Sequence, residues 1–322
     1  MVNQLPPAAG DTAPLEGGAV AAAAGAFNRL PPTALILLSI VSVQLGAALA
    51  TVLFSSLGPG GTAFVTSLLS AATLSLVRGR RGAPSLARAR RHLGLVLLFG
   101  LVYSAMALPF FLALERIPLG VLSTVTFLGP LGLAVATSRR PVHFACIGIA
   151  VLGVALLAPD VTGRLAHPMG SGGAGALDPL GLLFAAIGGI GWAAFVPMSK
   201  RAGAVFPGSE GLALALWASA AMLLPFALFE GGILDAGIGD LAGAFGVSLL
   251  GTVLPMAMEY RALQRMSARA YGILVTLEPA VGALVGVLCL GQPAGARMVI
   301  AVACVMLAAL GVTLTEDRPG GR

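Results

Sequence analysis

The chain has 322 residues, of which 57% are hydrophobic and only 10% are charged, and its mean hydropathy is +0.96. Soluble domains carry about 25% charged residues, so a soluble fold this apolar could not cover its own surface. The formal charge of +6 comes from short basic clusters between long apolar runs, without the basic helix or aromatic-basic pattern of nucleic-acid binders. The composition therefore predicts a protein of the lipid bilayer and argues against nucleic acid as a partner.

The first 30 residues differ from the rest of the chain. Residues 1–28 are rich in Ala, Gly and Pro. Asp11 and Glu16 stand where a cleaved signal peptide would need Lys or Arg. Such a segment has too little apolar surface to fold by itself. We therefore expect residues 1–30 to form a disordered cytoplasmic tail.

Ten apolar stretches qualify as membrane helices, since about 20 apolar residues are needed to cross the hydrocarbon core. In chain order they are 33–54, 61–77, 93–113, 119–137, 142–158, 179–198, 211–229, 241–260, 270–290 and 296–314. Turn-forming residues separate them, as in the Ser-, Gly- and Pro-rich run at 55–61. The expected fold class is an all-α membrane protein with ten transmembrane helices.

Basic residues predict the orientation, because loops rich in Lys and Arg stay in the cytoplasm. With the N-terminus inside, 16 of the 19 Lys and Arg residues fall on the cytoplasmic side. Both termini are then cytoplasmic, residues 316–322 form a second tail, and the protein is expected in the inner or plasma membrane. The Gly-rich run 159–178 is interpreted as a linker loop between two halves, 31–158 and 179–315.

The two halves resemble each other at a constant offset. Residues 113–118 (Ala-Leu-Glu-Arg-Ile-Pro) match 262–267 (Ala-Leu-Gln-Arg-Met-Ser) at an offset of 149, and the same offset carries Leu128-Gly129-Pro130 onto Leu277-Glu278-Pro279. Each half holds five spans, so an odd count turns the second half upside down in the membrane. Two inverted five-helix repeats are therefore expected, an arrangement typical of secondary transporters with a midplane substrate site.

Glu278 is the most informative residue, because it lies midway along the ninth span. A carboxyl at the bilayer centre costs at least about 2.5 kcal/mol, so such a residue usually faces a cavity and has a function. The alternative is a hydrogen-bonded packing residue. Pro279 removes a backbone donor and is expected to break the helix beside it. Tyr271 and Thr276, on the same span, complete this part of the candidate substrate and proton site.

Four further residues belong to the candidate site. Glu259 either forms a surface ion pair with Arg261 or lines the cavity. Gln44, an amide within the first span, either holds helices together or contacts substrate. Thr126 lies in the fourth span, which is opposite the span of Glu278 in the repeat, although its hydroxyl can also bond back to its own helix. Pro130 is expected to break the fourth span as Pro279 breaks the ninth.

Motifs of other protein classes are missing from the chain. It has no Walker motif, no GxSxG and no metal-spaced His/Cys set, and its three cysteines lie inside apolar runs. We expect no cofactor, no bound metal and no enzymatic activity. A membrane-embedded enzyme or a structural protein is the alternative of another class, and it leaves the repeat and the intramembrane carboxyl without a purpose.

Several local stretches resemble the drug/metabolite transporter superfamily with EamA-type repeats, and within it the threonine/homoserine exporter group. The resemblance covers about residues 33–316 and rests on residues 42–47 (SVQLGA), 117–120 (IPLG), 127–131 (FLGPL), 138–142 (SRRPV), 200–204 (KRAGA), 254–259 (LPMAME) and 277–280 (LEPA).

This resemblance implies ten spans in two inverted repeats and proton-coupled export of small amino acids by antiport with alternating access. The implied partners are a small-molecule substrate, protons and the bilayer. The chain departs from the exporter group at three positions: Thr126 replaces an acidic residue, Gln292 replaces a glutamate, and span two begins without the basic residue often found there. Export of drugs or other small metabolites is the alternative within transport.

Overall fold

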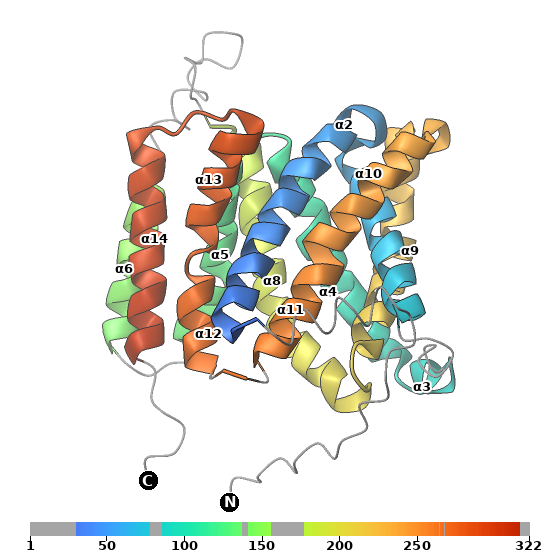
Figure 1. Cartoon of the computed structure of the whole chain (residues 1–322), viewed down its shortest axis with the longest axis horizontal. Helices are drawn as coiled ribbons and strands as arrows, with labels where there is room; N and C mark the ends of the chain where they lie inside the picture. Colours follow the sequence, from blue (N-terminus) through green and yellow to red (C-terminus); the bar gives the residue numbers. More distant parts are fainter. Residues whose placement is uncertain are drawn as a thin grey trace, which may run out of the picture.

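The structure is a computed structural model and describes residues 30–77, 86–136, 141–155, 177–263, 265–266 and 268–315. All regular elements within these ranges are helical (Figure 1). They are α2 (Pro32–Val77), α3 (Leu86–Arg91), α4 (Leu93–Leu114), α5 (Leu119–Ala136), α6 (Pro141–Ala155), α8 (Pro179–Val205), α9 (Glu210–Glu230), η1 (Gly232–Asp235), α10 (Ile238–Ser248), η2 (Leu249–Val253), α11 (Leu254–Leu263), α12 (Ala268–Val275), α13 (Glu278–Leu290) and α14 (Ala296–Thr315). The predicted all-α class is confirmed.

The surface of this bundle is suited to lipid. Among the described residues, seven helices are long and apolar enough to cross a membrane, and two shorter apolar helices cover 119–133 and 144–153. Large apolar side chains point outward, with Phe229 94% exposed and Ile238 88% exposed. Only a hydrocarbon environment covers such a surface without cost. The chain is therefore a multi-pass membrane protein.

The helix α2 contains one sharp interruption, at Gly58. This residue has φ 67° and ψ 169°, and Pro59 begins the second part of the helix. The second part starts with free backbone N–H groups, and the Glu230 carboxylate accepts from Gly60 N at 2.8 Å and from Gly61 N at 3.1 Å. The turn expected over 55–61 is thus confined to one residue, because glycine alone adopts this backbone geometry at little cost.

A second irregularity lies between α10 and α11. The five residues of η2 form a π-helical turn, which leaves a carbonyl without its usual helical partner. The Ser42 hydroxyl of α2 donates to the Leu250 carbonyl at 2.7 Å and satisfies that group. Gly46 of α2 approaches the same turn so closely that a Cβ there would lie 2.8 Å from the Gly251 nitrogen. This close contact joins α2 to the irregular turn.

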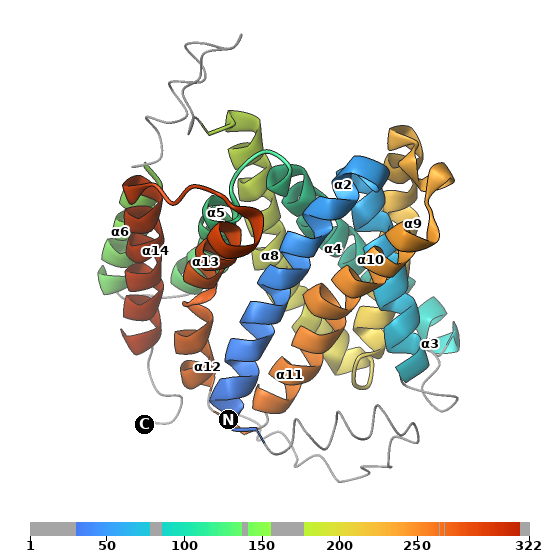
Figure 2. The ribbon, with the colours of Figure 1, turned by 45° about the horizontal axis from the view of Figure 1, so that its top comes forward.

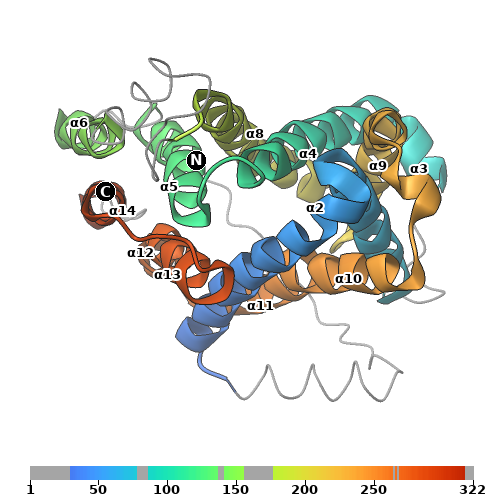
Figure 3. The same ribbon diagram turned by 90° about the horizontal axis from the view of Figure 1, so that it is seen from above.

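The helices form two groups, which can be followed in the tilted view of Figure 2 and from above in Figure 3. Helices α5, α6, α12, α13 and α14 lie together on one side, and α2, α4, α9, α10 and α11 on the other, with α8 packed against both α4 and α5. Helix α2 begins and α14 ends at the same end of the bundle, which we call the terminal end. The opposite end, where α13 connects to α14, is called the far end.

Gly58 provides a test of the interruption in α2. Gly58→Ala places a Cβ in the left-handed region and against the Glu230 carboxylate. The left-handed backbone alone costs roughly 1–2 kcal/mol for a residue with a Cβ. We expect the midpoint of thermal unfolding in detergent to fall by roughly 3 °C or more. Gly94→Ala, at a helical site with no neighbour within 4 Å of its added Cβ, is the control and should leave the midpoint unchanged or higher.

Candidate functional site

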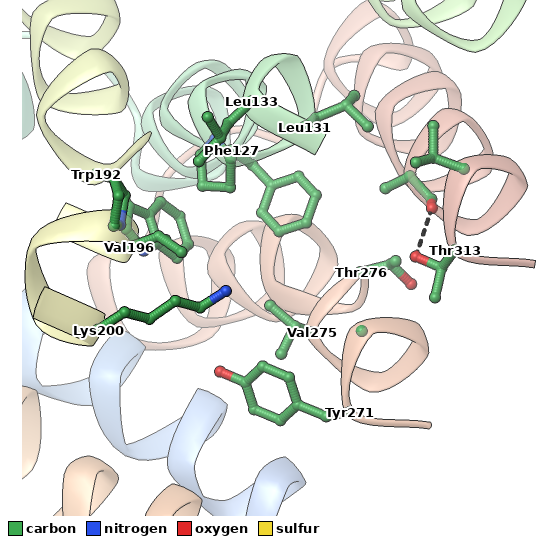
Figure 4. A pocket seen from close by; sticks show the side chains of 15 residues that line it. Phe127, Leu131, Leu133, Trp192, Val196, Lys200, Tyr271, Val275, Thr276 and Thr313 are labelled. Carbon is green, nitrogen blue, oxygen red and sulfur yellow. Dashed lines mark hydrogen bonds between the residues drawn. The ribbon is translucent and has the colours of Figure 1, made fainter. Parts of the chain in front are cut away.

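A cavity of 520 Å³ lies between α5, α8, α12 and α14 (Figure 4). It is lined by Phe127, Pro130, Leu131, Leu133, Trp192, Val196, Pro197, Lys200, Tyr271, Gly272, Val275, Thr276, Ala309, Val312 and Thr313. Thr313 lies near the last residue of α14 and Tyr271 near the first residue of α12, so the cavity is at the terminal end. Lys200 is exposed and Thr276 is 5% exposed, so the cavity extends from the surface into the bundle.

Helices α5 and α13 are closed against each other toward the far end. A Cβ on Gly120 of α5 would lie 2.7 Å from the Ala283 Cα of α13, which leaves no gap between them. The Leu119 N–H, at the start of α5, donates to the Gln292 side-chain oxygen at 2.9 Å. The side-chain carbonyl of Gln292, in the connection between α13 and α14, thus satisfies a backbone N–H that has no partner within α5. The cavity is open toward the terminal end and closed toward the far end.

The ninth predicted span is divided beside Glu278. Helix α12 ends at Val275 and α13 begins at Glu278, with Pro279 in its first turn. Proline in a first turn loses no helical hydrogen bond, so it favours a new start at this point. Within the described residues, no hydrogen-bond partner contacts the Glu278 carboxylate, which is partly buried at the positive end of α13.

Glu259 faces the interior of the bundle. Its carboxylate accepts from the Tyr271 hydroxyl at 3.0 Å and from the Ser39 hydroxyl at 3.1 Å. These bonds connect α11 to α12 and α2. Tyr271 also lines the cavity, and its hydroxyl projects into that space in Figure 4. Glu278 interacts electrostatically with both Glu259 and Tyr271, so two carboxylates and one phenol form an acidic cluster beside the cavity.

Gln44 and Thr126 lie in packed contacts between helices. Gln44 is 2% exposed, and its side-chain oxygen accepts from the Ser123 hydroxyl at 3.3 Å, which links α2 to α5. The Thr126 hydroxyl donates to the Leu122 carbonyl of its own helix at 2.9 Å. A Cβ on Gly189 would lie 2.8 Å from the Thr126 carbonyl oxygen, so α8 crosses α5 directly at this residue.

Pro130 does not interrupt its helix, and the expected break is wrong at this position. Helix α5 runs from Leu119 to Ala136 with Pro130 inside it. A proline removes a single N–H bond, and a packed membrane helix tolerates that loss more readily than a division into two segments. Pro130 instead contributes to the cavity wall.

Sequence reasoning missed the wall of the cavity that α8 provides. Trp192 packs edge-on against Phe127, with ring centroids 5.9 Å apart. Trp192, Val196 and Lys200 recur every four residues and so share one helix face that lines the cavity. The four-residue spacing is visible in the sequence and places these three residues on one helix face. Nothing in the sequence indicates that this face, and not another, meets a cavity. No three His, Cys, Asp or Glu side chains converge as metal ligands in the described part of the chain.

A multi-pass helical bundle with a one-sided cavity and intramembrane carboxylates has the architecture of a membrane transporter. Residues 179–314 match the model of the EamA-like transporter family. The threonine/homoserine exporter RhtA of Salmonella typhimurium strain SL1344 is 32% identical over 299 residues, covering 91% of this chain and 96% of that protein. The RhtA protein of Escherichia coli strain K12 is 31% identical over 296 residues, with 90% and 95% covered.

The chain belongs to the EamA-like transporter family. Its family is one of transporters and not of enzymes. One solved crystal structure, 21% identical in sequence, matches with a TM-score of 0.59 and covers 88% of this chain and 97% of its own. At that identity the match concerns the fold alone.

Cysteine labelling tests the one-sided opening of the cavity. In a background without Cys146, Cys289 and Cys304, we introduce Thr313→Cys at the cavity and Ser123→Cys, a site 3% exposed in the closed region. A water-soluble maleimide should modify position 313 at least roughly tenfold faster than position 123, because thiol reaction requires access. Equal rates in the detergent-solubilised protein would contradict a cavity open only toward the terminal end.

Proposed function

We propose that the protein exports small amino acids of the threonine and homoserine type across the inner or plasma membrane by proton antiport. The observation that carries this proposal is the acidic cluster of Glu259, Glu278 and Tyr271 beside the cavity. A carboxylate attracts the ammonium group of an amino acid and also exchanges protons. Two relatives similar over about 90% of the chain are named threonine/homoserine exporters, which supports the same substrate class.

The fold proposed for this function has ten crossings. Seven helices are long enough to span a membrane, α2 among them. The α2 helix contributes two crossings because Gly58 divides it. The shorter apolar helices α5 and α6 contribute one each. The repeats are proposed as residues 31–158 and 179–315, joined by 159–178, of which 159–176 lie outside the described residues; so do the two tails, except for residue 30.

Helix contacts support an inverted repeat. Under an exchange of the halves, the packing of α4 on α8 corresponds to the packing of α10 and α11 on α2. The packing of α5 on α8 corresponds likewise to that of α12 and α13 on α2. The pairs α5 with α13 and α6 with α14 each correspond to themselves. A pseudo-two-fold axis in the membrane plane gives this pattern of contacts.

The basic residues support a cytoplasmic terminal end. Helix α3, with Arg88, Arg90 and Arg91, lies at that end (Figure 1). Lys200 and Arg201 are close to the end of α8 on the same side. Arginine-rich segments remain in the cytoplasm, so the cavity is proposed to open inward, where an exporter collects its substrate.

Labelling in intact cells tests this orientation. In the cysteine-free background, a membrane-impermeant maleimide should modify Ala294→Cys, in the connection between α13 and α14 at the far end, without cell disruption. Arg90→Cys, on α3, should react only after the cells are opened. Both side chains are exposed, so a difference in reactivity reports the side of the membrane. Reaction of position 90 in intact cells would overturn the orientation.

The proposed mechanism is competition between substrate and proton for the acidic cluster. A carboxyl in an apolar environment favours its neutral form, and a nearby ammonium favours the charged form. Substrate binding therefore releases a proton, and proton binding releases substrate, since linkage is reciprocal. Inward proton flow then drives outward substrate flow when the site faces the two sides in turn. The α5–α13 contact at the far end is the part that has to open in the outward-facing state.

Glu278→Gln tests the coupling. Glutamine keeps the size of the side chain but does not titrate, so export driven by a pH gradient should fall to background while expression stays near normal. Exchange of substrate for substrate survives if binding does. The measurement is efflux of labelled threonine from proteoliposomes with and without a pH gradient. Glu115→Gln, at a 41% exposed side chain after α4, is the control and should transport like the parent.

Accumulation by Glu278→Gln against a gradient with unchanged pH dependence would remove Glu278 from the coupling step, and Glu259→Gln would be the next variant.

The aromatic pair of Phe127 and Trp192 favours a second candidate function, export of apolar metabolites or drugs. A labelled lipophilic cation in the same vesicles separates the two functions. Transport of that cation without transport of threonine or homoserine would replace the amino-acid proposal.

A further inference from the structure

We propose that Lys200 binds the carboxylate of the transported substrate, and that the substrates are therefore zwitterions with a free carboxylate. This inference rests on the proposed function and deepens it. Lys200 lines the cavity from α8, and in Figure 4 its side chain extends into the space toward Tyr271 on the facing α12. The Tyr271 hydroxyl is bonded to Glu259 on its other side. A cationic group and an acidic cluster thus approach the same space from opposite walls.

The charge distribution of the cavity matches an amino acid. Of the ion pairs between described residues, none includes Lys200; they join Arg88 to Glu210 and Arg116 to Glu115 and Asp178. The polar groups on the cavity wall include the hydroxyls of Thr276 and Thr313, which bond back to carbonyls of their own helices. Among the lining residues that the structure describes, Lys200 is the only cation, so it is the described group that can neutralise a substrate carboxylate.

Lys200 differs in residue type and in position from the arginines that set the orientation of the protein in the membrane. It is the only lysine among the 19 Lys and Arg residues of the chain. Arg201 follows it and is also exposed, but does not line the cavity. A lysine ammonium on a flexible stem is a compact charge that can follow a small ligand, whereas an arginine fork prefers a fixed bidentate geometry. A residue needed only for orientation would serve equally well as arginine.

Binding at Lys200 and at the acidic cluster together would select for both ends of the substrate. An amino alcohol keeps the ammonium and the side chain but has no carboxylate, so it loses only the Lys200 contact. Closure of the cavity removes water and strengthens that contact, because charges interact more strongly at low dielectric. Threonine and threoninol are therefore the pair of probes that isolates the contribution of Lys200.

Transport kinetics in proteoliposomes test the assignment. The parent protein should prefer threonine to threoninol. Lys200→Gln should raise KM for threonine roughly tenfold, the usual effect of one lost charge-assisted hydrogen bond, and leave KM for threoninol unchanged. Lys200→Arg keeps the charge and should keep most of the preference. Arg201→Gln, the neighbouring exposed cation outside the cavity wall, should behave like the parent.

A chemical measurement on the parent protein needs no variant. Because Lys200 is the only lysine, N-hydroxysuccinimidyl acetate acylates a single side-chain amine, with the N-terminal amine as internal reference. Threonine should slow acylation of Lys200 in the solubilised protein, measured by peptide mass, and threoninol should not. Threonine transport with an unchanged preference in Lys200→Gln, or equal protection by both probes, would overturn the role of Lys200. Failure of the parent to transport threonine would overturn the proposed function itself and the substrate assignment with it.

Discussion

The hydrocarbon of a bilayer offers no hydrogen bonds, and the rest of this structure depends on how the chain satisfies its backbone within that solvent. Where a helix is interrupted, a group from another helix or the local turn supplies the missing partner. Glu230 accepts from the amides that follow Gly58, and Ser42 donates to the carbonyl freed by the π turn of η2. At the break between α12 and α13, the Leu277 N–H bonds to Leu274 and proline lacks an N–H altogether. The first two interruptions are therefore also points where helices are held together, and the third one positions Glu278.

The sizes of the side chains between the helices explain why the cavity is confined to one end. Helices α5 and α13 meet without side-chain volume between them at Gly120 and Ala283, and the Gln292 amide satisfies the start of α5 at the far end. Toward the terminal end, Phe127 and Trp192 introduce large side chains that hold the wall of α5 and α8 in place. Small residues at one end and aromatic residues at the other give a bundle that closes at the first and leaves a space at the second. Under the proposed alternating access, these glycine contacts are the ones that would have to separate.

Sequence reasoning reached the parts of this site that follow from local chemistry. A carboxyl and a proline inside an apolar run indicate an interrupted helix, and the break lies beside Glu278. The all-α class follows from composition, because a chain this apolar lies in hydrocarbon, where helices satisfy their own backbone groups. Pro130 has the same local signal but a different outcome, because packing of α5 on its neighbours maintains the helix. Lys200 resembles an ordinary basic residue at a helix end, and its place on a cavity wall depends on the tertiary arrangement of α8 and α12. The Glu259–Tyr271 bond likewise joins residues on separate helices, whose pairing no spacing predicts.

The location of Tyr271 bears on how charge in the acidic cluster reaches the cavity. Val275, Thr276 and Tyr271 are cavity-lining residues, whereas Glu259 and Glu278 are not. The Tyr271 hydroxyl donates to Glu259 and also lines the cavity. Because an ammonium group only donates hydrogen bonds, the ammonium of a substrate in the cavity would meet the phenol oxygen before it meets the carboxylate. When the carboxylates are charged, the phenol oxygen is polarised and attracts a cation; when they are neutral, this attraction weakens. In the proposed antiport, the phenol would transmit the protonation state of the cluster to the cavity wall, and Glu259 would keep its hydrogen bonds while substrate and proton exclude each other.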